Sequence, residues 1–222
     1  MTGIYIVRHC EAMGNVRRIF QGLTDLDISE NGEKQLECLK NRFSDIPLDK
    51  IYSSPLIRTR KTAEAIRGDR NIEIEVFDGL IEINGGILEG MPFADSFKKH
   101  PDLADAWDNH PEDFHPEQGE LMSDAYERIW DAVLSIAKKN KGKTIACATH
   151  GGVTRCLNCR LSFGDIKKLK DTDWSDNTAV SYIEFDDDFS PKLIFANDTS
   201  HLPKELLVKR IRISRLISGE AE

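Results

Sequence analysis

Short apolar runs alternate along the chain with longer segments in which apolar residues recur every three or four positions. The first run, Gly3–Val7, is too short for a helix and rich in β-branched and aromatic residues, which is typical of a strand buried on both faces. Comparable runs follow at irregular intervals. Together they predict strands at residues 3–7, 49–54, 72–77, 144–149, 181–185 and 193–196.

The segments between these runs carry a helical spacing of apolar residues. Leu36, Leu39 and Phe43 share one helical face, and Ser29 is placed to cap the start of that helix. Gly68 ends the second periodic segment, because glycine readily adopts the backbone that terminates a helix. We therefore expect helices over residues 31–43, 56–67, 120–140 and from about 152 to 163.

Repeated strand–helix alternation predicts an α/β fold, a three-layer sandwich whose central, mostly parallel sheet is flanked by helices. The chain has 222 residues and contains no internal repeat or linker, so we expect a single domain over residues 1–222. Prolines interrupt the region between the third strand and the longest helix. We interpret residues 83–119 as a lid-like segment within that domain.

Composition narrows the classes of function. Hydrophobic residues make up 40% of the chain and charged residues 31%, as in ordinary globular proteins. The net charge of −8 disfavours binding to nucleic acid or to an anionic membrane. No apolar run approaches the roughly 18 residues of a spanning helix, and the N-terminus does not read as a signal peptide. Five scattered cysteines indicate a reduced protein, so we expect a cytoplasmic location.

Two histidines directly follow predicted strands. His9 comes after the first strand, beside Arg8, and His150 follows the strand at 144–149. Arg58 lies just beyond another strand, and the carboxyl ends of parallel strands meet at one edge of a sheet. A neutral imidazole can accept a phosphoryl group, and one arginine side chain can donate two parallel hydrogen bonds to two oxygens of a phosphate. We therefore predict a phosphate-handling site that requires no metal and no other cofactor.

Five collinear motifs carry a resemblance to a known family. They are RHCEAMGN at 8–15, Gln21-Gly22, SSPLIRTRKTAEAI at 53–66, LIEINGGILEG at 80–90 and TIACATHGGVTR at 144–155. Together they resemble the histidine phosphatase superfamily, whose fold is phosphoglycerate-mutase-like. This chain has Cys10 where the family usually has glycine, and Ala12 where it has serine or threonine.

The resemblance implies a role for each matching residue. His9 is the implied nucleophile, which forms a phosphohistidine, and Glu82 is the implied proton donor. The implied phosphoryl-binding groups are Arg8, Arg58 and His150, and the implied further substrate contacts are Asn15, Gln21, Gly22 and Gly151. The implied activity is hydrolysis of small phosphomonoesters, with a small phosphorylated metabolite as the partner. A phosphoglycerate mutase using the same site is the alternative.

Three other interpretations remain open from the sequence. A thiol phosphatase would use Cys10, although Arg17 lies one residue too far along for the H-C-x5-R loop of that class. A structural zinc site could combine Cys147-x2-His150 with Cys156-x2-Cys159. A phosphoester-binding or regulatory module with weak catalysis would fit the substitutions at Cys10 and Ala12. The basic, apolar stretch at 206–213 is interpreted as an exposed face packed on the domain.

Overall fold

A computed structural model describes residues 1–208, which form a six-stranded sheet in the order β3-β2-β4-β1-β5-β6. Four neighbouring strands are parallel, while β5 runs antiparallel to β1 and β6 antiparallel to β5. The strands are β1 (Thr2–Arg8), β2 (Lys50–Ser53), β3 (Ile74–Val76), β4 (Thr144–Thr149), β5 (Val180–Phe185) and β6 (Pro191–Asp198). The predicted α/β class and mostly parallel sheet are confirmed.

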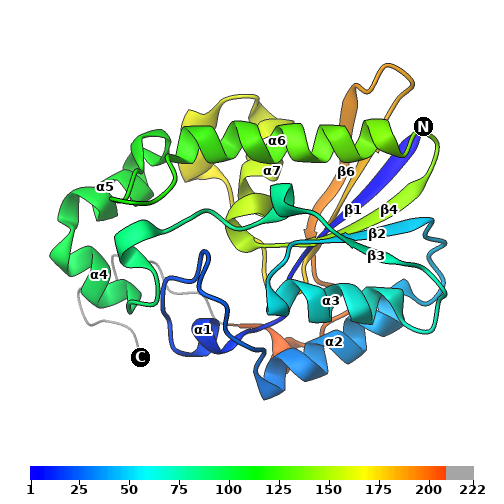
Figure 1. Ribbon diagram of the computed structural model, residues 1–222, viewed down its shortest axis with the longest axis horizontal. Helices are drawn as coiled ribbons and strands as arrows, with labels where there is room; N and C mark the ends of the chain where they lie inside the picture. The colour runs from blue at the N-terminus through cyan, green and yellow to red at the C-terminus, as the bar shows by residue number, and fades with distance from the viewer. Residues whose placement is uncertain (209–222) are drawn as a thin grey trace.

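Helices cover both faces of this sheet (Figure 1). On one face lie α2 (Glu30–Phe43) and α3 (Ile57–Arg67), and on the other α6 (Met122–Lys139) and α7 (Gly151–Phe163). Alternate residues of β1 explain this arrangement: Ile4 and Ile6 pack in the core under α6 and α7, whereas Val7 packs in the core under α2 and α3. Both faces of the central strands are therefore buried, as their continuous apolar sequence predicts.

The helix ends follow the sequence closely. The Ser29 side chain accepts a hydrogen bond from the Gly32 amide and caps α2. Gly68 follows α3 with a φ of 55°, a conformation that favours glycine. Among residues 1–208 the structure contains no helix long and apolar enough to cross a membrane. The stretch interpreted at 206–213 extends beyond the described residues.

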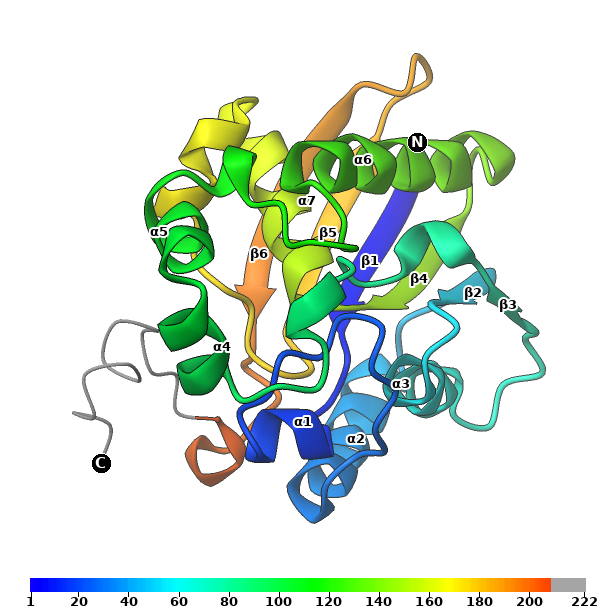
Figure 2. The ribbon, with the colours of Figure 1, turned by 60° about the vertical axis from the view of Figure 1, so that its left-hand side comes forward.

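Residues 83–119 hold structure that the sequence periodicity did not predict. Two helices, α4 (Phe93–Lys99) and α5 (Pro101–Asn109), lie here, and a short α1 (Met13–Val16) also follows β1. In Figure 1 both α4 and α5 lie beyond the carboxyl ends of the central strands, and in Figure 2 they lie one above the other at the left. Phe97 of α4 and Trp107 of α5 form an aromatic cluster with Phe20 and Phe114.

Candidate active site

The carboxyl ends of the two central strands bring two buried histidines together. β1 leads into His9 and β4 into His150, and the two imidazole centroids lie 5.4 Å apart. His9 is 3% exposed and His150 is fully buried. Burial, together with the nearby charges of Arg58 and Arg8, lowers the pKa of each imidazole well below its usual range. Both rings are therefore neutral at neutral pH.

The tautomer of His9 follows from its main-chain neighbour. Its Nδ1 lies 2.6 Å from the carbonyl oxygen of Cys10, and a carbonyl can only accept, so Nδ1 carries the proton. The lone pair is consequently on Nε2. The main-chain carbonyl of His9 accepts a hydrogen bond from the side-chain Nδ2 of Asn177 at 3.0 Å. These contacts hold a neutral imidazole with a free nucleophilic nitrogen.

Arg58 is a fully buried cation held by main-chain oxygens. Its Nη1 donates to the carbonyl of Thr24 at 2.9 Å, and its Nη2 donates to the carbonyls of Gln21 and Gly22 at 3.1 and 2.8 Å. The Nε atom is buried without a hydrogen-bond partner among the described residues. A buried donor left unpaired costs about 1–3 kcal/mol, which indicates a place where an acceptor from a ligand binds.

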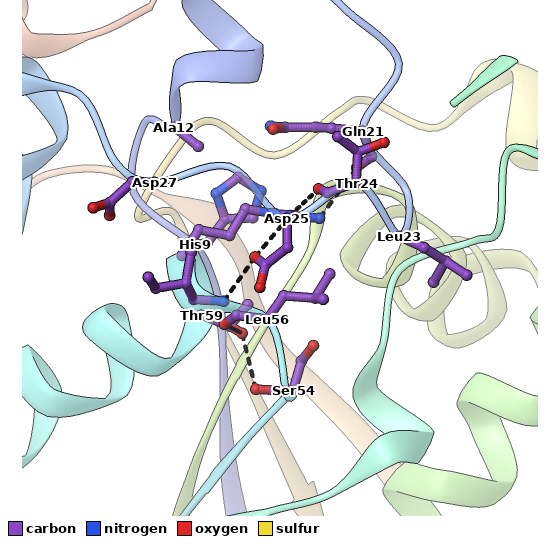
Figure 3. Close-up of polar contacts among 12 residues, drawn as sticks. His9, Ala12, Gln21, Leu23, Thr24, Asp25, Asp27, Ser54, Leu56 and Thr59 are labelled. Atoms are coloured by element: carbon purple, nitrogen blue, oxygen red, sulfur yellow. Dashed lines mark hydrogen bonds and ion pairs between the residues drawn. The ribbon is translucent and has the colours of Figure 1, made fainter. Parts of the chain in front are cut away.

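Glu89 fixes the loop that supplies these carbonyls. One carboxylate oxygen accepts from the amides of Leu23 and Gly85, and the other accepts from the amide and hydroxyl of Thr24, all within 2.6–2.9 Å. Gly22 must be glycine, because a Cβ there would lie 2.1 Å from the carbonyl of Ile83. Figure 3 shows the neighbouring side chains of His9, Gln21 and Asp25, with Leu23 pointing away from them.

His150 shows the same pattern of one used and one unused nitrogen. Its Nε2 lies 2.7 Å from the hydroxyl of Ser54 at the end of β2, and its Nδ1 is buried without a partner among residues 1–208. Both amide atoms of Gln21 are likewise buried and unpartnered there. Unpaired polar atoms on His150, Gln21 and Arg58 are what a site for an anionic, multiply hydrogen-bonding group requires.

Glu82 is held at the start of α7. Its carboxylate accepts from the amides of Gly152 at 2.9 Å and Ile83 at 3.0 Å. Burial raises the pKa of this carboxyl, and that effect exceeds the opposing effects of the two hydrogen bonds and of Arg58 and Arg8. A Cβ at Gly152 would lie 2.5 Å from the nearer carboxylate oxygen, so a glycine is needed beside it.

The remaining predicted residues surround this group in different ways. Arg8 donates through Nη1 to the Ser175 carbonyl at 2.5 Å, and a Cβ at Gly151 would lie 3.2 Å from Arg8 Nε. Asn15 accepts from the amide of Ala12 at 2.9 Å, so its carbonyl oxygen is used within the loop that starts α1. Four further residues orient the site through hydrogen bonds, and the sequence does not predict them: Ser54, Glu89, Ser175 and Asn177. The first two lie inside the motifs.

The rival interpretations based on cysteine do not fit this geometry. Cys10 is fully buried, and burial raises the pKa of its thiol to about 12, whereas a nucleophilic cysteine needs a lowered pKa. The residues with positive φ in the described part do not include Cys10, so its position does not require glycine. For the zinc interpretation, no group of three or more potential ligands gathers anywhere within residues 1–208.

Comparisons with known proteins identify the family of the chain. The family model of the histidine phosphatase superfamily (branch 1) matches residues 4–199. Phosphoserine phosphatase 1 of Hydrogenobacter thermophilus is 33% identical over 190 residues, 84% of this chain and 88% of the relative.

Two solved structures are also similar. YhfR of Bacillus stearothermophilus has a TM-score of 0.86 at 31% identity and covers 90% of this chain and 99% of its own. The phosphoserine phosphatase of Entamoeba histolytica, solved in complex with 3-phosphoglyceric acid, has a TM-score of 0.80 at 28% identity and covers 91% of this chain and all of its own. The chain belongs to the histidine phosphatase superfamily, branch 1.

Proposed function

We propose that this protein is a metal-independent phosphatase that hydrolyses small phosphomonoesters through a phosphohistidine on His9. The observation that carries the proposal is a buried, neutral imidazole with an available Nε2, in a site where Arg58 and His150 each have a buried polar nitrogen without a partner among the described residues. Relatives named as phosphoserine phosphatases support the hydrolytic reaction and make phosphoserine the first substrate to test.

In the first step the lone pair of His9 Nε2 attacks phosphorus, and the bond from phosphorus to the ester oxygen breaks. The leaving oxygen takes the electron pair of that bond and a proton from Glu82, whose pKa is raised by burial. A dianionic phosphate beside it favours the protonated carboxyl further. Arg8, Arg58 and His150 stabilise the charge on the three transferring oxygens.

In the second step water attacks the phosphoryl group. Glu82, now ionised, accepts a proton from that water, the phosphorus–nitrogen bond breaks, and the electron pair returns to His9 Nε2. Inorganic phosphate leaves, and both residues return to their starting protonation states. The segment at 83–119 would act as a lid that contacts the organic half of the substrate.

A substrate panel tests the proposal. Phosphate release is measured from phosphoserine, sugar phosphates, nucleoside monophosphates and 3-phosphoglycerate, with conversion of 3-phosphoglycerate to 2-phosphoglycerate followed in parallel. We expect phosphate release from at least one monoester, abolished in His9→Ala, and an acid-labile, alkali-stable phosphoryl group on the quenched wild-type protein. Isomerisation without net phosphate release would favour the mutase, and binding without either reaction would favour a regulatory module.

A further inference from the structure

Two tryptophans stack where the lid-like segment meets the loop before β5. Trp107 of α5 and Trp174 have ring centroids 5.5 Å apart and ring planes inclined by 22°. Arg155 of α7 lies over the Trp174 ring at 4.6 Å from its centroid. Arg155 itself is nearly buried and donates to the carbonyls of Leu169 and Thr172. Trp174 is thereby held by α5 and α7 together.

The loop that carries Trp174 also carries contacts to the candidate catalytic residues. The next residue, Ser175, supplies the carbonyl that accepts from Arg8 Nη1 at 2.5 Å. Two residues further on, Asn177 donates to the carbonyl of His9 at 3.0 Å. A Cβ built on Gly151 would lie 3.2 Å from Arg8 Nε and 3.6 Å from Cε3 of Trp174, so Arg8 and the indole border the same glycine.

On the other side, Trp107 is embedded in the lid. It is 9% exposed, and its ring packs against Phe20, Phe97 and Phe114 with centroids 5.6, 6.0 and 4.8 Å away. Close packing transmits displacements, since side chains in such a cluster have few alternative positions. A shift of α5 would therefore move Trp107, and with it the indole of Trp174.

We propose that Trp174 is a positioning residue for Arg8, and that its stacking on Trp107 couples the lid segment to phosphate binding. This inference rests on the proposed function, because it assigns Arg8 to the transferring phosphoryl group. Docking of the lid fixes the loop, the loop carbonyl fixes the guanidinium, and the guanidinium meets the phosphate oxygens. Misplacement of a binding group by about 1 Å can cost on the order of a hundredfold in rate, so the stack need move only slightly to matter.

The test compares Trp174→Ala, Trp174→Phe and Trp107→Ala with the matched control Trp130→Phe. Trp130 is the third tryptophan of the chain, lies in α6 and packs near Phe185 rather than against the lid. The binding probe is orthovanadate, followed by isothermal titration calorimetry, and kcat and KM are measured on p-nitrophenyl phosphate. Thermal melting of each variant shows that the binding measurements are made on folded protein.

We expect Trp174→Ala and Trp107→Ala each to weaken vanadate binding about tenfold and to raise KM, since they remove aromatic and cation–π contacts that order the loop. Trp174→Phe should recover most of the affinity, and Trp130→Phe should bind vanadate as the wild type does. The double variant Trp107→Ala/Trp174→Ala should lose clearly less affinity than the sum of the two single losses, because both substitutions remove the contact between the two rings.

Two outcomes would overturn the inference. Wild-type vanadate affinity in a folded Trp174→Ala protein would show that the indole does not position Arg8. Fully additive effects of the two alanine substitutions would show that the rings act separately. A wild-type protein that binds vanadate but releases no phosphate from any monoester would refute the proposed function instead, while the vanadate measurements would still decide the coupling.

Discussion

Replacing Glu82 by glutamine tests whether this side chain donates a proton to the leaving group. Glutamine has nearly the same shape and retains one carbonyl acceptor, but it has no acidic proton. In the structure the carboxylate accepts from the amides of Gly152 and Ile83, so the substitution places an NH2 group against one of these donors. The variant therefore loses the acid and one hydrogen bond, and these two losses have different sizes.

The choice of substrate distinguishes the rate lost with the acidic proton from the rate lost with the hydrogen bond. General acid catalysis contributes roughly 10²–10⁴ in rate, and an alkyl phosphate such as phosphoserine needs all of it because an alkoxide leaves poorly without a proton. A p-nitrophenolate leaves without protonation, so p-nitrophenyl phosphate should suffer only the lost hydrogen bond. That loss is about 0.5–1.5 kcal/mol, or up to roughly tenfold.

The assay is kcat/KM for both substrates in the wild type, in Glu82→Gln and in Gly152→Ala. The alanine variant is a matched test that keeps the carboxyl but displaces it, since its Cβ would lie 2.5 Å from the carboxylate oxygen. Both variants should lose far more activity on phosphoserine than on p-nitrophenyl phosphate. Wild-type activity on phosphoserine should also fall as pH rises through the raised pKa of Glu82, and this alkaline limb should vanish in Glu82→Gln. Equal losses on the two substrates would refute the assignment of Glu82 as the acid.

Further expectations concern the other groups of the site. Arg58→Ala should lower kcat/KM by about 10³–10⁵, and a near-wild-type rate in a steady-state assay would remove Arg58 from the site. His9→Ala should abolish turnover while Cys10→Ser preserves most of it, and the reverse ranking would favour a thiol nucleophile. Glu89→Gln should raise KM for phosphomonoesters on the order of tenfold, because an amide cannot accept all four donors that order the loop holding Arg58; an unchanged KM would separate that loop from substrate binding. The pKa values of His9 and His150 are lower in the folded state than in the unfolded state, so the folded state binds protons less readily. Their contribution to stability is therefore present above the unfolded pKa of about 6.5 and is lost as the pH falls below it. The melting temperature should fall between pH 8 and pH 5, and it should fall less in His9→Asn.

The regular elements were predictable because local pattern and tertiary environment agree. The continuous apolar runs of β1 and β4 form strands buried on both faces, and Ser29 and Gly68 cap helices where the sequence predicts them. The two helices within residues 83–119 are not predicted from the sequence, because proline usually interrupts a helix. Pro101 occupies the first turn of α5, a position that needs no amide hydrogen bond and so accommodates proline.

In the candidate site, too, only some of the residues could be predicted from the sequence. Of the residues that would touch the phosphoryl group, Arg8, His9 and His150 lie at strand ends and Arg58 lies in the first turn of α3. All four lie within recognisable motifs, so their approximate convergence could be predicted from a parallel sheet. The groups that orient them could not, because each acts through a contact that sequence order conceals. Ser54 reaches His150 across 96 residues, and the Ser175 carbonyl that holds Arg8 is a main-chain atom which any residue type could supply.

The use of main-chain carbonyls to hold the arginines has a consequence for catalysis. A carboxylate partner would orient Arg58 but would also offset the charge that a phosphoryl group needs. Three carbonyls orient it equally well while remaining neutral, and the ion pair with the half-exposed Asp25 is long, at 3.9 Å. Burial of such a cation without a close ionic partner is costly, so an anion that pairs with Arg58 would offset that cost; in the proposed mechanism this anion is the phosphoryl group. Burial, with a further contribution from the Arg58 charge, lowers the pKa of His9 and keeps the ring neutral, so in the proposed mechanism Arg58 would serve both phosphate binding and the nucleophile.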